Sequence, residues 1–171
     1  MVAIGSGKLH NPPQGNTVLP APPTNRLSPK NQVTLPRDAA ALVGDPAHLR
    51  ALPHWMPGKA DRAVHSPVVV LMSDVELRKR ERCIIEAPNL SAEDKQVLVQ
   101  DLNARAAQLA IDEQRRVVMP QHFVDYLKLE RDALFVTTGE LIYLWNPLEF
   151  QRWSSAAAPA GAPDLTQFIL V

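Results

Sequence analysis

Apolar and polar positions alternate along two short segments of the chain, and such alternation predicts a half-buried β-strand. The first segment is centred on Val33 and comes shortly before Pro36. The second is centred on Val117 and comes shortly before Pro120. Proline favours the first position of a helix, where its missing N–H would have had no partner. The pattern therefore predicts a turn, a strand and a short helix at two places in the chain.

The two segments are copies of one pattern. A shift of 84 positions places residues 27–42 on residues 111–126, with Val33 on Val117. An internal repeat constrains the architecture of a chain, and two copies are too few for a solenoid. We therefore expect a pseudo-twofold domain whose two halves share one hydrophobic core.

The first copy continues with a buried strand at residues 68–72 and a helix that opens with the pattern of a capping box. In this motif the Ser73 side chain caps the helix and the Glu76 side chain reaches back to Ser73. Prolines between residues 44 and 67 predict a loop-rich insertion. This insertion accounts for the 11 residues by which the shift between the copies falls from 84 to 73 positions.

A further helix, capped by Ser91, is predicted to connect the two copies and to pack across both of them. Its apolar stripe has helical spacing and consists of Leu98, Leu102, Ala106 and Leu109. Strands at residues 133–137 and 141–145 then complete the second copy, together with a final helix that has Asn146 as its N-cap.

These elements give an α+β fold that is rich in β-structure. The chain is expected to comprise a Pro-rich flexible arm (residues 1–24), a first repeat (25–82), a connecting helix region (83–110), a second repeat (111–153) and a low-complexity tail (154–171).

Composition changes this picture in two ways. Lys and Arg number 18 and so do Asp and Glu, so any attraction to nucleic acid must come from a local patch. The single cysteine, Cys83, cannot form an internal disulfide, which is typical of a reducing compartment. No apolar run reaches the length of a membrane span. We therefore expect a cytoplasmic protein with no membrane partner.

Other candidate chemistry is weak. The spacings between His48, His54 and His65 match no metal-ligand pattern, so no metal site is expected. No glycine-rich phosphate loop or activated nucleophile suggests a cofactor or an enzyme. The basic residues at 78–80 and 82 are interrupted by Glu81 and favour a solvated helix face over a nucleic-acid patch.

In the second copy, Asp112 and Arg116 give the pattern Asp-x-x-x-Arg, followed by a small apolar strand and a proline. The two copies together, about residues 25–153, resemble the MraZ family of the AbrB-type swapped-hairpin superfamily, whose marker is this pattern in each repeat. Residues 141–153, LIYLWNPLEFQRW, are similar to the family's closing segment. Arg115 stands where the family often has glycine.

The first copy departs from the marker. Ser28 occupies the position of the aspartate and Gln32 that of the arginine, while Lys30 keeps the family's lysine. Asn31 occupies a turn position that favours a left-handed residue, which asparagine tolerates.

The resemblance implies two β-β-α-β-β-α repeats of the swapped-hairpin type that share one core, and a regulator of transcription. Its partners would be double-stranded DNA, with promoter repeats of cell-division and cell-wall genes as targets, and further copies of the chain in a ring larger than a dimer. The location would be the nucleoid. DNA would be contacted by Arg116, Arg115, Lys30 and Gln32. Asp112, Ser28 and Asn31 would shape the turns.

Two alternatives remain open. The first is an oligomeric scaffold or partner-binding protein of the same fold that has lost most DNA binding, which the degenerate marker of the first copy supports. In such a protein Asp112 and Arg116 could simply pair across the turn. An antitoxin-like protein of the AbrB type is less favoured because such a protein normally needs only one repeat.

Overall fold

The computed structural model describes residues 22–44, 47–157 and 159–162, which form an α+β fold. Its helices are α1 (Arg37–Leu42), α2 (Asp74–Glu86), α3 (Ala92–Arg105), α4 (Gln121–Leu127) and α5 (Pro147–Ser155). Its strands are β1 (Asn25–Arg26), β2 (Gln32–Thr34), β3 (His48–Pro57), β4 (His65–Met72), β5 (Ala107–Ala110), β6 (Arg116–Val118), β7 (Asp132–Thr138) and β8 (Leu141–Trp145). Among these residues, no helix is long and apolar enough to cross a membrane.

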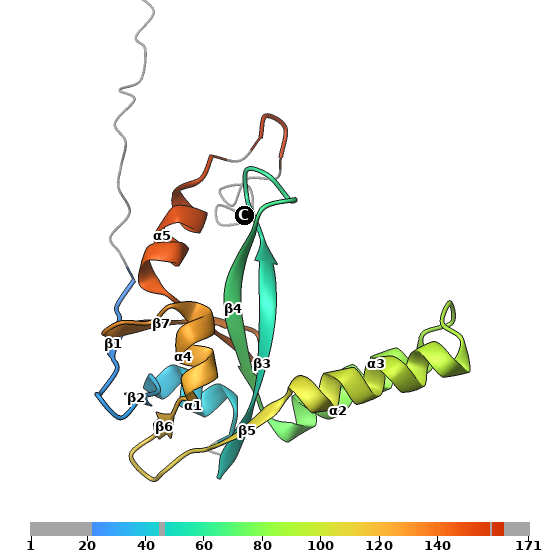
Figure 1. The fold of residues 1–171 in the computed structure, drawn as a ribbon, viewed down its shortest axis with the longest axis horizontal. Helices are drawn as coiled ribbons and strands as arrows, with labels where there is room; N and C mark the ends of the chain where they lie inside the picture. Colours follow the sequence, from blue (N-terminus) through green and yellow to red (C-terminus); the bar gives the residue numbers. More distant parts are fainter. Residues whose placement is uncertain (1–21, 45–46, 158, 163–171) are drawn as a thin grey trace, which may run out of the picture.

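Six of the strands form one antiparallel sheet in the order β1-β7-β8-β4-β3-β5. Strands β3 and β4 form one hairpin and β7 and β8 the other, and the two hairpins meet at the centre of the sheet. Each flanking strand pairs with the hairpin of the other half of the chain: β1 with β7, and β5 with β3. Figure 1 shows the curled sheet with α4 and α5 beside it.

The remaining strands, β2 and β6, pair with each other as a separate two-stranded sheet. We call these two strands, with the turns at residues 28–31 and 112–115 that precede them, the ribbon. Figure 1 shows the ribbon next to α1, away from the crossing of the two hairpins.

The pairing register is symmetric about two residue pairs. In the ribbon, Val33 lies opposite Val117, its counterpart 84 positions later. At the centre of the sheet, Val70 lies opposite Tyr143, its counterpart 73 positions later. Two equivalent halves related by a twofold axis would give this register.

Two groups of buried residues hold these elements together. The larger group joins both halves and includes Val33, Val117, Leu49, Leu144 and Phe123. The smaller group packs around Trp145, whose ring contacts Phe150 and Trp153 of α5 at centroid distances of 5.4 and 5.3 Å.

The expectation of a loop at residues 44–67 is wrong, because residues 48–57 form the strand β3 and residues 65–67 belong to β4. Prolines disfavour a strand that is paired on both sides, since they lack an N–H. Strand β5 pairs only with residues 48–51 of β3, so Pro53 and Pro57 lie beyond its end, where one side of β3 is an edge. The extra residues of the first half therefore lengthen the β3–β4 hairpin.

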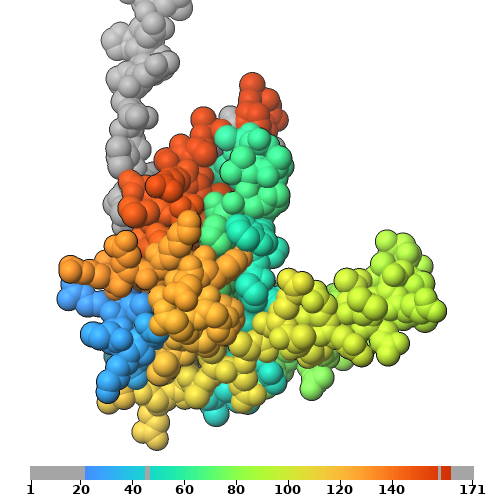
Figure 2. Space-filling view, viewed as in Figure 1, coloured from blue at the N-terminus to red at the C-terminus, as the bar shows by residue number. Residues whose placement is uncertain are grey.

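Helices α2 and α3 form an arm that stands out from the body, as Figure 2 shows. Ser73 caps α2 as expected, but the side chain of Glu76 pairs with Lys79 and Arg80 instead of reaching back. The expectation that α3 packs across both halves is also wrong. None of its residues is buried, and Leu109 of the predicted stripe belongs to β5.

Little of the organisation predicted for the two ends of the chain can be compared with the structure. The described residues do not include most of the predicted Pro-rich N-terminal segment, residues 1–21. They also do not include the apolar end of the predicted tail, residues 163–171. Helix α5 ends at Ser155, close to the predicted start of the tail.

Candidate nucleic-acid interface

The second turn of the ribbon is held by Asp112. One oxygen of its carboxylate, Oδ1, accepts hydrogen bonds from the backbone N–H groups of Gln114, at 2.9 Å, and Arg116, at 2.8 Å. The backbone N–H of Arg115 donates to the Asp112 carbonyl at 2.8 Å. These bonds close a tight turn in which Arg115 has φ 61°, a left-handed conformation that is uncommon for a large side chain.

The first turn has the same hydrogen bonds with a different side chain. Ser28 Oγ accepts from the backbone N–H groups of Lys30, at 3.2 Å, and Gln32, at 3.0 Å. Asn31 is left-handed here, with φ 57°. A serine hydroxyl can replace the carboxylate because the turn requires only a short side-chain acceptor. The departure at Ser28 from the family's marker therefore leaves the turn intact.

The ribbon has one buried face and one accessible face. Val33 and Val117 point inward and are 1% and 0% exposed. Side chains alternate along a strand, so the neighbouring positions point outward. These are Gln32, Thr34, Arg116 and Val118, all of them half-buried or exposed.

Arg116 binds the turn with one edge of its guanidinium group. Its Nε donates to Asp112 Oδ2 at 2.7 Å. Among the described residues, the two terminal nitrogens of Arg116 have no hydrogen-bond partner, and 42% of the side chain is exposed. The contact with Asp112 therefore orients the side chain and leaves four N–H donors on its outer end.

The hydrogen bonds of the turn also affect the acidity of Asp112. The backbone N–H of Arg116, followed by its guanidinium group, lowers the pKa of this carboxyl below the ordinary value of 3.8. The stabilisation that this carboxylate gives to the folded turn is complete above that ordinary value. It is lost as the pH falls through the lowered pKa.

We expect Asp112→Ser to keep the turn, because Ser28 makes the same backbone hydrogen bonds in the first turn. Asp112→Ala removes the acceptor and should lower the free energy of unfolding. Thermal unfolding of both variants at neutral pH measures the difference. An equal loss of thermal stability in both variants would show that the carboxylate itself is required.

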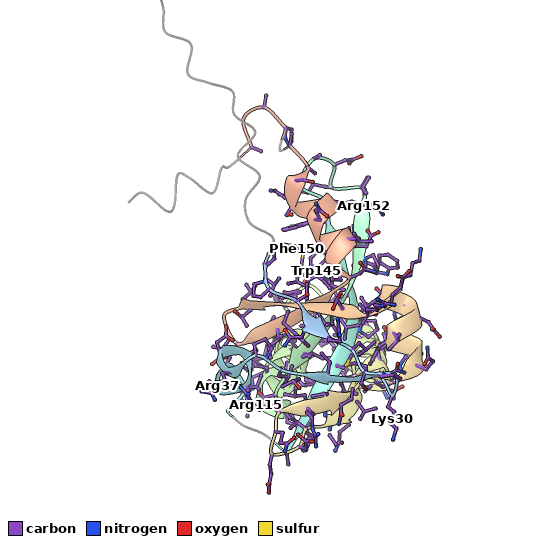
Figure 3. The ribbon with its side chains drawn as sticks, turned by 90° about the vertical axis from the view of Figure 1, so that its left-hand side faces the viewer. Lys30, Arg37, Arg115, Trp145, Phe150 and Arg152 are labelled. Carbon is purple, nitrogen blue, oxygen red and sulfur yellow. The ribbon has the colours of Figure 1, made fainter. Side chains whose placement is uncertain are left out.

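The other predicted residues lie around this face. Lys30 is exposed at the tip of the first turn. Arg115 is half-buried and lines a hollow together with Arg37, the first residue of α1. Arg37 was not among the residues predicted from the sequence. Figure 3 shows Arg37 and Arg115 near one end of the ribbon and Lys30 near the other.

The structure does not favour a binding site at two other groups of residues considered from the sequence, the basic residues of α2 and the three histidines. Three of the four basic residues of α2 are engaged in ion pairs: Arg78 with Glu81, Lys79 with Glu76 and Glu140, and Arg80 with Glu76. This agrees with the interpretation of the α2 residues as a solvated helix face. The predicted histidines do not gather, and no group of three possible metal ligands occurs in the described ranges.

His48 has a structural partner instead. Its Nε2 lies 2.5 Å from Asp74 Oδ2, and Arg50 Nε donates to Asp74 Oδ1 at 2.6 Å. The hydrogen bond from Arg50, and then that with His48, lowers the pKa of Asp74. Asp74 is the first residue of α2, so this cluster attaches the arm to β3.

Comparison with known proteins agrees with the resemblance noted from the sequence. Residues 102–167 match a family model described as MraZ protein, antitoxin-like. The transcriptional regulator MraZ of Rickettsia typhi is 25% identical over 133 residues, which cover 78% of this chain and 84% of that protein. The chain is therefore similar to the MraZ family, at an identity of about a quarter to these regulators.

A second MraZ regulator, that of Ruegeria sp., is 23% identical over 131 residues, or 71% of this chain and 78% of that protein. The match to the family model begins near the end of α3 and includes β5, β6 and the second hairpin. It thus covers the copy that carries the intact marker. Both of these MraZ proteins are named as transcriptional regulators.

Proposed function

We propose that this protein is a sequence-specific DNA-binding regulator of transcription whose DNA-contacting surface is the ribbon. The observation that carries the proposal is the outward orientation of Arg116, whose inner edge is held by Asp112 while its outer end has no partner among the described residues. A guanidinium group presented in this way can donate two hydrogen bonds to guanine O6 and N7.

The shape of the ribbon supports this function. The major groove of B-DNA admits a two-stranded β-ribbon. Arg116 lies opposite Thr34 across the ribbon, and Gln32 lies opposite Val118, so polar side chains lie on both strands of the outward face. Lys30 and Arg115 at the two turns would contact phosphates on either side of the groove.

We also propose that the two halves are repeats of the swapped-hairpin type and that the protein assembles into a ring larger than a dimer. Several apolar side chains on the arm are exposed: Val75 at 65%, Ile85 at 55%, Val97 at 65% and Leu98 at 41%. Contacts between copies would bury them, and a ring would present several ribbons to one DNA molecule. Its targets would be promoter repeats of cell-division and cell-wall genes, and its location the nucleoid.

A gel shift on the DNA upstream of the protein's own gene tests this proposal, with a duplex of scrambled sequence as the control. We expect a shift of the upstream duplex at protein concentrations that leave the scrambled duplex free. Equal binding to both duplexes would refute sequence-specific recognition.

Light scattering tests the assembly. We expect a homo-oligomer with more than two copies at micromolar concentration, because the exposed apolar residues of the arm favour contact between chains. A monomer under these conditions would exclude the ring and would remove the multivalency on which tight DNA binding depends.

The scaffold alternative is favoured by one observation, the contact between Arg116 and Asp112 within the turn. If this contact served only the fold, removing Arg116 would weaken the turn or the oligomer and would leave DNA binding unchanged. Measuring both properties on the same variant separates the two functions.

A further inference from the structure

Arg37 and Arg115 come from different halves of the chain and line the same open hollow beside the ribbon. Arg37 opens α1, and Arg115 is the left-handed residue of the second turn. Glu113 and Gln114 of that turn also line the hollow, together with two alanines of α1. In Figure 3 both arginines lie at the end of the ribbon opposite Lys30.

Neither arginine is neutralised by a carboxylate in the described ranges. None of the ion pairs found there involves Arg37 or Arg115. Arg115 Nη1 is shielded from solvent and has no hydrogen-bond partner in the same part of the chain. A shielded guanidinium nitrogen without a partner is unfavourable, so a rotation of the half-buried side chain that brought this nitrogen to an anion in the hollow would be stabilised.

The corresponding place at the first turn is satisfied by neutral groups. A shift of 84 positions takes Arg115 back to Asn31 and takes Arg37 forward to Gln121. Asn31 Nδ2 donates to Gln121 Oε1 at 2.8 Å. One end of the ribbon therefore has a paired amide couple, and the other end has two arginines that form no ion pair with any described residue.

We propose that Arg37 and Arg115 together bind one phosphate group of the DNA that lies on the ribbon. A phosphate carries the charge that both guanidinium groups require, and its oxygens can accept hydrogen bonds from each of them. This assignment rests on the proposed function, since the same chemistry would also bind free inorganic phosphate. Glu113 lines the same hollow and opposes the anion.

The two ends of the ribbon would then act differently on DNA. At the first turn, Lys30 is the cation and Asn31 is occupied by Gln121. At the second turn, a pair of arginines fixes one phosphate and so sets the position of Arg116 over the base edges. Contacts to phosphates position a protein on the duplex, whereas contacts to bases specify the sequence.

The double variant Arg37→Gln with Arg115→Asn tests this inference, because it copies the amide couple of the first turn and so preserves the local packing. Its matched control is Arg62→Gln with Arg82→Gln, which removes two exposed arginines from the hairpin loop and from α2. Fluorescence anisotropy would follow binding to the upstream duplex over a range of salt concentrations.

We expect the double variant to bind about tenfold more weakly at low salt, and its salt dependence to fall by about 0.9 log units per log unit of salt, the value of one phosphate contact. The control should keep the wild-type salt dependence. The reciprocal double variant, Asn31→Arg with Gln121→Arg, should raise the salt dependence by a similar amount. Wild-type DNA binding and salt dependence in the first double variant would overturn the phosphate site and leave the proposed function standing.

A titration with inorganic phosphate separates the two proposals. NMR signals of the arginine Nε–H groups should shift in the wild-type protein and not in the Arg37→Gln, Arg115→Asn variant. If the wild-type protein fails to bind DNA but shows this shift, the proposed function is wrong and the arginine pair is a site for free phosphate. If it shows neither DNA binding nor the shift, both proposals are wrong.

Discussion

Replacing Arg116 with alanine should weaken binding to the upstream duplex by about 1–3 kcal/mol, which is roughly 5- to 150-fold in the dissociation constant. The outer end of this guanidinium group has no partner among the described residues, so its loss leaves no protein group unsatisfied there. The substitution also removes the hydrogen bond from Arg116 Nε to Asp112 Oδ2. Asp112 Oδ1 still accepts the two backbone N–H groups that close the turn. The oligomer should therefore remain unchanged.

Variants at the other ribbon positions provide a graded comparison. Gln32→Ala should have a smaller effect than Arg116→Ala, because a neutral amide releases no counterions and reaches less far. Lys30→Ala should lie between them and mainly reduce the salt dependence, since lysine acts on phosphate as a point charge.

Gln32→Arg is the substitution that is expected to strengthen DNA binding. This change places the family's residue in the first copy, where the turn already has the hydrogen bonds of the second. It should tighten DNA binding without altering the oligomer. If Arg116→Ala binds DNA normally while the oligomer dissociates, the marker serves as a structural clasp and the scaffold alternative is correct.

Trp145→Ala should lower the free energy of unfolding by about 3–5 kcal/mol, the usual loss for a large aromatic residue in a core. Trp145 is 2% exposed and is the centre of the smaller buried group, where it contacts Phe150 and Trp153 of α5. Trp153 Nε1 in turn donates to the Pro57 carbonyl of β3 at 2.9 Å. The substitution should thus release α5 from the long hairpin. Chemical denaturation measures the change.

Trp55→Ala is the matched control for this substitution. Trp55 is 53% exposed and packs edge-on against Tyr126 with the ring centroids 5.5 Å apart. Its loss should cost about 1 kcal/mol, in the range of an aromatic pair. Similar losses at both positions would show that the smaller buried group is not a core.

The local elements could be predicted because their causes are local. The strand at residues 141–145 has the predicted bounds. Ser91 caps α3 through the Asp94 N–H at 3.0 Å, and Asn146 caps α5 through the Leu148 N–H at 2.9 Å. A cap needs only one side-chain acceptor within three residues, which a sequence displays directly.

The long hairpin was missed because its cause lies in another part of the chain. Pro53 and Pro57 argue against a strand unless one side of that strand is an edge. That edge exists because β5 ends its pairing with β3 at residue 51, and nothing in the local sequence of β3 shows where β5 ends. The failure of the packing expected for α3 has a related cause, because helical spacing identifies an apolar stripe but not its partner.

The candidate site was predicted in part. The marker identified Asp112 and Arg116, whose hydrogen bonds depend on residues four positions apart. Arg37 was not identified, because its place beside Arg115 depends on the antiparallel pairing of β2 with β6. The shift of 84 positions contained a clue, since it relates Arg37 to Gln121 and Arg115 to Asn31.

The most direct test of the ribbon as the DNA-contacting surface is photo-crosslinking of the protein to the upstream duplex carrying 5-iodouracil, followed by mass spectrometry of the linked peptides. The outward face of the ribbon predicts crosslinks within residues 28–34 and 112–118. Crosslinks confined to the arm of α2 and α3, with none in the ribbon, would contradict the proposed interface.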